Sequence, residues 1–351
     1  MTSQFDIQLS LESDFQTLVT AADRVRHENV GDAVHLRGLI ELSNFCRCRC
    51  GYCGINADNK SVTRYRLTEE DVRQSVPLAI RFGYGTIVFQ AGEDLGLTED
   101  FIARQVEWIK SLPTPWGAPL AVTLSLGQRT AAEYKRWRDA GANRCLIRFE
   151  TSSEKLFAQW HPHDPDGQKR RLNFLYELRD LGYEIGTGFL IGAPGQTPDD
   201  WRNDLETIRT LQPDMIGIGP YLPHPQTALG QAPENELVPP TKQNVLRTLA
   251  LCRLLCPKAN IPSTTALAAL DKTHGHEDGL CCGANVIMPN ITPGKYRRLY
   301  EIYPAKSNTA EEAERFDAIL KARIESLGRV VGRGPGGVAP LPVRAAAREV
   351  L

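Results

Sequence analysis

The chain has 351 residues, 42% of them hydrophobic and 24% charged, which is typical of a folded protein with a full hydrophobic core. Its formal net charge of −1 gives no overall field that would favour nucleic acid or an anionic membrane. No apolar run reaches the ~18 residues of a membrane span, and the opening MTSQFDIQLSLESDF lacks the pattern of a secretory signal. We therefore expect a cytoplasmic protein whose nine cysteines stay reduced, so that disulfides are disfavoured.

Eight short β-rich runs alternate along the chain with segments of helical period. We expect strands at 35–43, 85–90, 119–125, 144–149, 183–191, 213–219, 260–265 and 284–288. Helices are expected between them, for example at 68–83, where Thr68 with Asp71 or Glu70 resembles an N-terminal cap, and at 130–142. Eight strands alternating with helices predict an α/β fold of the (βα)8 TIM-barrel kind, complete or nearly so. An open doubly wound sheet is the alternative, but its GxGxxG turn is missing.

Three regions are distinguished by composition. Residues 1–34 form a predicted N-terminal helical extension that plugs or flanks the amino-terminal end of the barrel. The barrel itself is expected at 35–305. Residues 306–351 are expected to hold a C-terminal helix and a tail rich in Gly, Pro and Arg, interpreted as an extended arm along the surface.

The stretch SNFCRCRCGYCGIN (43–56) places Cys46, Cys48, Cys50 and Cys53 within eight positions. Cys46, Cys50 and Cys53 form a C-x3-C-x2-C pattern on the loop after the first predicted strand, where three thiolates can hold three corners of an iron–sulfur cubane. Structural zinc normally takes four protein ligands, and ferredoxin motifs bring a fourth cysteine. The spacing favours a cluster with one iron left open, and a zinc-stabilised loop is the alternative. Cys48 is interpreted as a non-ligand, because C-x-C is too short to reach separate irons.

With Tyr52 directly before the last cysteine, the pattern resembles the signature of radical S-adenosylmethionine (SAM) enzymes. This resemblance implies a barrel of radical SAM type, a 4Fe-4S cluster on Cys46, Cys50 and Cys53, and SAM bound at the open iron. It also implies reductive cleavage of SAM to methionine and a 5′-deoxyadenosyl radical, with the protein supplying orientation and exclusion of water.

Further segments between residues 35 and 305 resemble the HydE family of FeFe-hydrogenase maturases, which belongs to the same branch as biotin synthase and methylornithine synthase. They include TIVFQAGED (86–94), GYEIGTGFLIGAPGQT (182–197), MIGIGPYLPHPQT (215–227) and CGANVIMPNITPGKYRRLYEIYP (282–304). Nearly all of them fall at the carboxyl end of a predicted strand, where barrel active sites are built.

Site residues follow from this resemblance and from their places on the strands. The expected SAM contacts are Tyr52, Gln90, Gly92, Glu93, Ser125, Glu150, Arg171 and Met215. Among them Glu93 would accept from the ammonium group of SAM, Glu150 would face its sulfonium and Arg171 would hold its carboxylate.

A substrate cavity is expected inside the barrel, lined by Thr123, Arg144, Arg148, Thr264, Thr265, Tyr296 and Tyr300. Arg144, Arg148 and Glu150 stand at even spacing, so their side chains project from one side of the strand. Buried charges are costly unless they are paired or used on a charged ligand. The alternatives are structural ion pairs for the arginines and packing for the tyrosines. The loop His274–Cys282 has residue types that suit a metal, although a plain solvated loop explains them equally.

The resemblance implies a radical SAM maturase that processes an organometallic Fe(CO)2CN-cysteine-type precursor in assembly of the diiron subcluster of FeFe-hydrogenase. Its expected partners are this small molecule, an electron donor such as ferredoxin or flavodoxin, and other hydrogenase maturases, with no nucleic acid and no membrane. The alternatives are a radical SAM mutase acting on an amino acid, a biotin synthase-like sulfur-chemistry enzyme, and a non-catalytic iron–sulfur or zinc carrier.

Overall fold

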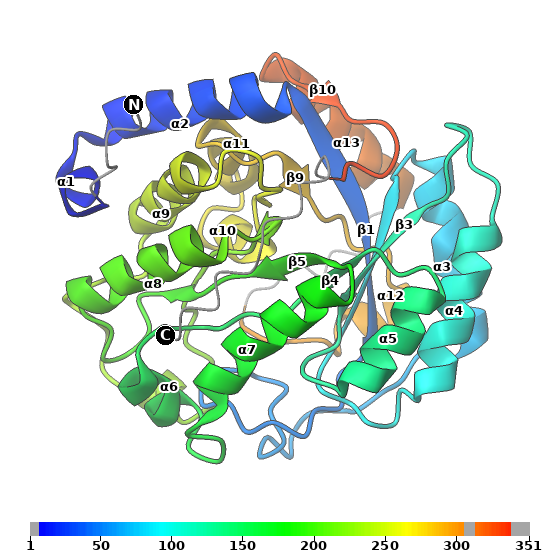
Figure 1. Ribbon diagram of the computed structural model, residues 1–351, viewed down its shortest axis with the longest axis horizontal. Coiled ribbons are helices and arrows are strands. Elements are labelled where there is room, and N and C mark those ends of the chain that lie inside the picture. The colour runs from blue at the N-terminus through cyan, green and yellow to red at the C-terminus, as the bar shows by residue number, and fades with distance from the viewer. Residues whose placement is uncertain (1–6, 305–312, 338–351) are drawn as a thin grey trace.

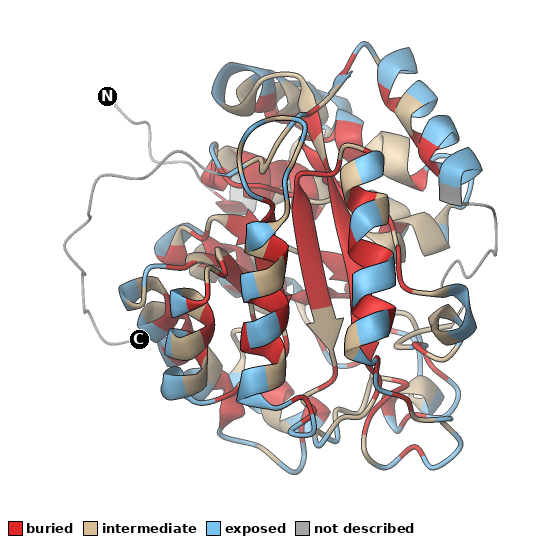
Figure 2. Ribbon diagram, turned by 90° about the vertical axis from the view of Figure 1, so that its right-hand side faces the viewer, coloured by how far each residue is buried: buried red, intermediate tan, exposed pale blue. Residues whose placement is uncertain are grey.

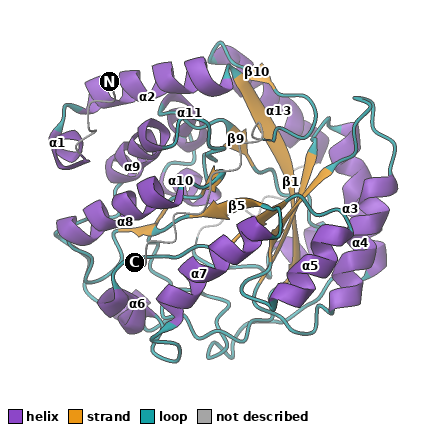
Figure 3. Ribbon diagram, in the orientation of Figure 1, coloured by secondary structure: helices purple, strands orange, loops and turns teal. Residues whose placement is uncertain are grey.

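The computed structural model describes residues 7–304 and 313–337. Parallel strands stand at its centre with helices around them (Figures 1 and 3). The parallel ladder runs through β1 (Ala33–Ser43), β2 (Thr86–Ala91), β3 (Ala121–Ser125), β4 (Arg144–Leu146), β5 (Glu184–Thr187) and β7 (Met215–Ile216). Single bridges then join Met215 to Asn260 and Pro262 to Val286 of β9 (Val286–Ile287), which pairs back with β1. The predicted α/β fold of TIM-barrel kind is confirmed as a curled parallel sheet, and only single bridges at residues 260–262 join its two edges.

Two of the expected strands are interrupted. The run expected at 183–191 forms β5 and the separate β6 (Leu190–Ile191), and the run at 213–219 forms β7 and β8 (Gly219–Pro220), with β6 paired to β8. Gly188 and Gly217 lie between these pairs, and a Cβ on Gly188 would stand 1.9 Å from the Gly217 carbonyl oxygen. The backbones of the two chain segments therefore pack directly on each other where the strands are interrupted. The alternation of apolar and polar residues in the sequence does not predict this contact.

Several helices begin at residues whose side chains cap them. Capping boxes start α3 (Glu69–Arg81) at Thr68 with Asp71, α5 (Ala131–Asp139) at Thr130, and α8 (Pro198–Leu211) at Thr197, so the predicted cap at Thr68 is confirmed. The other helices are α1 (Ile7–Glu12), α2 (Phe15–Val30), α4 (Glu99–Ser111), α6 (Glu154–Trp160), α7 (Gly167–Asp180), α9 (Lys242–Leu255), α10 (Thr265–Leu270), α11 (Gly275–Cys281), α12 (Gly294–Arg297) and α13 (Ala313–Ser326). None of these helices is both long and apolar enough to cross a membrane.

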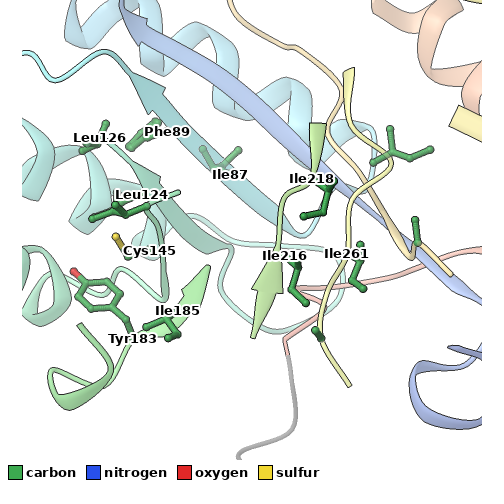
Figure 4. Close-up of a cluster of buried hydrophobic side chains, with 14 of the residues drawn as sticks. Ile87, Phe89, Leu124, Leu126, Cys145, Tyr183, Ile185, Ile216, Ile218 and Ile261 are labelled. Atoms are coloured by element: carbon green, nitrogen blue, oxygen red, sulfur yellow. The ribbon is translucent and has the colours of Figure 1, made fainter. Parts of the chain in front are cut away.

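The hydrophobic core lies between the strands and the surrounding helices. The central strands are mostly buried, whereas the long helices that pack on them show a buried face inside and an exposed face outside (Figure 2). Figure 4 shows core side chains from successive strands, among them Ile87, Leu124, Cys145, Ile185 and Ile216, all fully buried. Because strand residues alternate between two sides, this outward apolar layer leaves the residues in between to project into the barrel.

The amino-terminal mouth of the barrel is covered by the C-terminal segment. β10 (Val330–Val331) pairs with the start of β1, at Ala33 and Val34. Beyond it, the Pro335 carbonyl accepts hydrogen bonds from the Thr86 hydroxyl at 2.9 Å and from Arg144 Nη2 at 3.1 Å. The Gly336 carbonyl accepts from Arg37 Nη2 at 3.3 Å. Glycine and proline thus bring backbone oxygens to two buried arginines that need acceptors.

This placement corrects the expectation of a surface arm for residues 330–337, while residues 338–351 lie outside the described part of the chain. The expected N-terminal helical extension contains α1 and α2, and α2 packs along α9 on the outside (Figure 1). It therefore flanks the barrel, and the C-terminal segment is what covers the mouth.

A substitution at Gly85 tests this arrangement. A Cβ at that position would lie 1.8 Å from the Gly334 carbonyl oxygen, so Gly85→Ala is expected to displace the 332–337 segment. Overpacking of this kind costs about 1–3 kcal/mol, so the thermal unfolding midpoint should fall and the segment should become open to limited proteolysis. Gly294→Ala is the matched control, because its Cβ would meet no atom within 4 Å. Unchanged stability and proteolysis of Gly85→Ala would contradict the contact.

Candidate active site

The cysteine loop leaves the carboxyl end of β1 and lies close against the end of β2. Gly92, after β2, donates its N–H to the Ser43 carbonyl at 3.1 Å. A Cβ on Gly92 would stand 2.2 Å from the Phe45 carbonyl oxygen and 2.7 Å from Cys46 Cβ, so only glycine permits this approach. Gly92, an expected SAM contact, thus allows the end of β2 to pack closely on the cysteine loop.

One arginine holds the two ends of the loop together. Arg64 Nη1 donates to the carbonyls of Asn44 (2.5 Å) and Ile55 (2.7 Å). Its Nη2 donates to the carbonyls of Asn56 (2.7 Å) and Asn59 (3.1 Å). The loop has no regular secondary structure between β1 and α3. The charge-assisted hydrogen bonds from Arg64 therefore satisfy loop carbonyls that would otherwise pair in a helix or sheet. Sequence analysis missed Arg64, because nothing local marks it as more than one of several arginines.

The end of α6 supports the middle of the loop. Gly51 N donates to the Trp160 carbonyl at 2.8 Å. Nδ1 of buried His161 lies 3.0 Å from the Phe157 carbonyl and therefore carries the proton, which leaves Nε2 to accept from the Tyr52 hydroxyl at 3.1 Å. The segment between Cys50 and Cys53 is thereby fixed against a helix that follows β4. His161 was also missed, since only the fold brings it to Tyr52.

The four thiols differ in their electrostatic surroundings. All are free and half-buried. The backbone N–H of Cys48 donates to Cys46 Sγ at 3.4 Å. Interaction with Cys48 lowers the pKa values of Cys46 and Cys50 and raises that of Cys48. Burial raises the pKa of Cys53. Cys48 therefore lies against two of the three predicted ligands.

Glu93 is held at the carboxyl end of β2 by groups from two loops. Its carboxylate accepts from Arg47 Nε at 3.0 Å and from the backbone N–H of Gln128 at 2.7 Å. The Arg47 N–H also donates to the Glu93 carbonyl at 3.0 Å. A carboxylate predicted to bind the ammonium of SAM is therefore already oriented, and Arg47, which the sequence did not single out, is its charged partner.

Glu150 and Arg171 come together with the loop after β4. Glu150 has a positive φ of 68° and pairs with Arg148 Nη2 at 3.3 Å. Arg171 Nη1 donates to the Arg148 carbonyl at 3.2 Å. Burial alone would lower the pKa of Arg171, but Tyr52, Cys50 and Glu150 nearby raise it above its ordinary value. A left-handed glutamate backbone is strained, which is common at functional sites.

Several predicted cavity residues project into the barrel. Thr123 Oγ1 and Arg148 Nε are buried and have no hydrogen-bond partner among the described residues. Gln90 Nε2 lies 3.3 Å from the Tyr300 hydroxyl, and Thr265 Oγ1 accepts from Tyr303 at 2.9 Å. Ser125 ends β3 next to Gln90 in register. These positions offer polar groups inside an otherwise apolar shell.

The remaining predicted site residues have structural contacts instead. Arg144 pairs with Glu184 at 2.6 Å beside the C-terminal segment, so its placement at the amino-terminal mouth does not fit the expected substrate cavity. Met215 Sδ lies 3.1 Å from Arg37 Nη1, which is bonded to the same segment. Thr264 caps α10, accepting from Leu267 N. Tyr296 donates to Asp71 and stacks on Tyr65. Even spacing identified the inward side of a strand but not the end of the barrel.

A cavity of about 600 Å³ opens beside the cysteine loop. It is lined from the loop by Arg47, Cys48, Arg49 and Cys50, from the β2 end by Glu93 and Leu95, from the β3 end by Gln128, Arg129, Thr130 and Glu133, and from the β4 side by His161, His163, Asp164, Arg170 and Arg171. Three thiols on one loop beside this cavity suit a cubane, whose protein ligands stand at separate corners. Among the described residues no group of three or more His, Cys, Asp or Glu side chains is arranged around a single metal ion, in the cysteine loop or in the His274–Cys282 loop.

Comparison with known proteins agrees with this geometry. Residues 40–208 match the model of the Radical SAM superfamily. The chain is 42% identical over 322 residues to the FeFe-hydrogenase maturase subunit HydE of Thermotoga maritima, covering 92% of this chain and 88% of that protein. This chain belongs to the HydE family of radical SAM enzymes. It is also 27% identical over 339 residues to 3-methylornithine synthase of Methanosarcina acetivorans, covering 96% and 88% of the two chains.

Solved structures show the same fold for relatives of this HydE-family chain. The crystal structure of methylornithine synthase superimposes with a TM-score of 0.78 at 24% identity and covers 93% of each chain. The FeFe-hydrogenase maturase HydG superimposes with a TM-score of 0.72 at 18% identity, covering 89% of this chain and 68% of that one. At these identities the likeness supports the barrel and says nothing further of substrate.

Removal of the Arg64 guanidinium should loosen the cysteine loop. Hydrogen bonds from charged groups contribute about 1.5–3 kcal/mol each, so Arg64→Gln is expected to lower iron and sulfide per chain severalfold after anaerobic reconstitution. Arg104→Gln is the control, because Arg104 is 55% exposed and pairs with Glu69 on the surface. Full cluster loading in Arg64→Gln would show that the loop keeps its shape without this residue.

Asp204 gives a pH-dependent prediction about the loop after Glu150. On α8 it accepts from the N–H and hydroxyl of Ser152 at 2.5 and 2.7 Å, and burial raises its pKa from 3.8 to about 7. Since the folded pKa is raised, the contribution of Asp204 to stability is full below pH 4 and is lost as pH rises to 7. The unfolding midpoint of the wild type should therefore fall relative to that of Asp204→Asn as the pH rises from 4.5 to 7.5. Parallel pH curves would refute the shift.

Proposed function

We propose that this HydE-family enzyme cleaves SAM reductively at a 4Fe-4S cluster held by Cys46, Cys50 and Cys53. The observation that carries the proposal is the loop itself, which presents three half-buried free thiols beside Glu93, Glu150 and Arg171. When bound, the cluster and SAM supply one-electron cleavage that yields methionine and a 5′-deoxyadenosyl radical. The residues then bind and orient: Glu93 accepts from the SAM ammonium, Arg171 holds its carboxylate and Glu150 faces its sulfonium.

We further propose that the substrate is an Fe(CO)2CN-cysteine-type precursor of the hydrogenase diiron subcluster, processed in the cytoplasm with other maturases. Unpartnered polar atoms of Thr123 and Arg148 inside the barrel support a small substrate with anionic or polar groups. The identity of 42% to a hydrogenase maturase supports the pathway. Arg148 would bind such a substrate through Nε, which its contact with Phe189 O leaves available.

The substrate proposal is tested by supplying the chain to a strain that lacks this maturase. Restored hydrogenase activity supports it. The competing candidate is an amino acid, because the chain is also 27% identical to 3-methylornithine synthase. Failure to restore hydrogenase, together with SAM-dependent conversion of lysine by the purified enzyme, would replace the organometallic substrate with an amino acid.

Cysteine variants test the cluster assignment. Cys50→Ala removes one of three proposed ligands, so 5′-deoxyadenosine formation from SAM and dithionite should fall to background. Cys48→Ala removes a thiol that is not a proposed ligand and should retain most of the activity. Chromatography of the nucleoside product, with iron analysis of each variant, provides the measurement. Equal loss in both variants, or zinc in place of iron, would contradict the assignment.

A further inference from the structure

The cavity beside the cysteine loop has an excess of positive charge at its rim. Its lining includes five arginines, at positions 47, 49, 129, 170 and 171, against the three carboxylates of Glu93, Glu133 and Asp164. The whole chain has a formal net charge of −1. The positive excess is therefore a local property of the opening through which the thiols are reached.

The outer part of this rim is accessible and weakly paired. The side chains of Arg49 and Arg170 are 48% and 53% exposed, and their partners Asp58 and Asp164 are 56% and 44% exposed. Ion pairs between exposed side chains are weak, so both guanidiniums can take another carboxylate as partner. Leu95, 57% exposed, adds a large apolar side chain to the same lining. We call Arg49, Leu95 and Arg170 the basic rim.

The thiols lie directly behind the basic rim. Cys48 and Cys50 line the same cavity, and Arg49 stands between them in the sequence. On the outside of the strands, the helices cover the barrel (Figures 1 and 2). Across its amino-terminal mouth runs the C-terminal segment. The cavity at the basic rim therefore gives a protein that delivers electrons an approach to Cys48 and Cys50.

We propose that the basic rim is the docking surface for a small acidic electron-carrier protein. This inference rests on the proposed function, because SAM cleavage consumes one electron. The reduced carrier gives up one electron and leaves oxidised, and the electron enters SAM as its carbon–sulfur bond breaks, so that methionine departs with the sulfur lone pair. Leu95 between arginines resembles a protein–protein interface, which has an apolar centre and a polar or charged rim. Attraction between the arginines and an acidic carrier would speed their association.

The test compares two reductants on the cluster-loaded enzyme. In the double variant Arg49→Glu with Arg170→Glu, the ratio of 5′-deoxyadenosine formation driven by reduced flavodoxin to that driven by dithionite should fall at least tenfold. The Kd for flavodoxin should rise about tenfold or more, and wild-type binding should weaken with added salt, as expected for charge pairing. Arg323→Glu, whose side chain is 48% exposed on α13, is the control for charge reversal elsewhere.

A second variant keeps the proposal decidable if the double variant loses its cluster. Leu95→Asp alters neither arginine and should also weaken flavodoxin binding and flavodoxin-driven turnover, with dithionite-driven turnover intact. Unchanged flavodoxin affinity in both variants would overturn the docking surface. Absence of nucleoside formation with dithionite in the wild type would instead overturn the proposed function. The comparison of flavodoxin affinity between the wild type and the variants would still show whether the basic rim is the docking surface.

Discussion

The site depends on the capture of loop carbonyls by the Arg64 guanidinium. All three proposed cluster ligands come from a segment without helix or strand, so no backbone ladder sets their mutual geometry. Arg64 binds carbonyls on both sides of the cysteines, and the Trp160 carbonyl binds Gly51 in the middle. Each bond is modest by itself, but together they convert a flexible segment into one that presents its thiols in a single arrangement. Pre-organisation of this kind lowers the entropy lost when a cluster is assembled.

The two ends of the barrel use similar charges differently. At the amino-terminal mouth, Arg144 is satisfied by Glu184, Thr86 and the Pro335 carbonyl, so it serves to hold the C-terminal segment. At the other end, Arg148 keeps an unpartnered Nε and Glu150 stands in a strained conformation. Residues that are fully satisfied stabilise the fold, whereas unsatisfied or strained ones are those available to a ligand.

Local patterns in the sequence predicted much of this structure. The Thr68 cap, the alternation of strands and helices, and the cysteine loop after β1 all depend on neighbours a few residues apart, and the structure contains each of them. The 42% identity to HydE agrees with the family that the motifs resembled. Long-range contacts could not be predicted: Arg64, His161 and residues 330–337 acquire their roles from partners brought close only by barrel closure. The same applies to Arg144: residue alternation predicts that its side chain points into the barrel, but not at which end of the barrel it lies.

The cysteine loop must satisfy two opposing demands, and the fold separates them in space. Radical chemistry requires a barrel interior from which water is excluded, yet an electron has to arrive from outside. Toward the interior the barrel is closed by packed side chains such as Tyr300, which is fully buried against Gln90, and by the segment at the far mouth. Toward solvent the loop exposes Arg47 and Arg49 while its thiols stay half-buried. Hydrogen bonds from Arg64 to backbone carbonyls hold this loop in place. Its side chains do not belong to a helix or sheet surface, so some can point into the barrel and others toward solvent. The absence of regular structure in this segment is therefore what allows one short stretch to border both the barrel interior and the exposed basic rim.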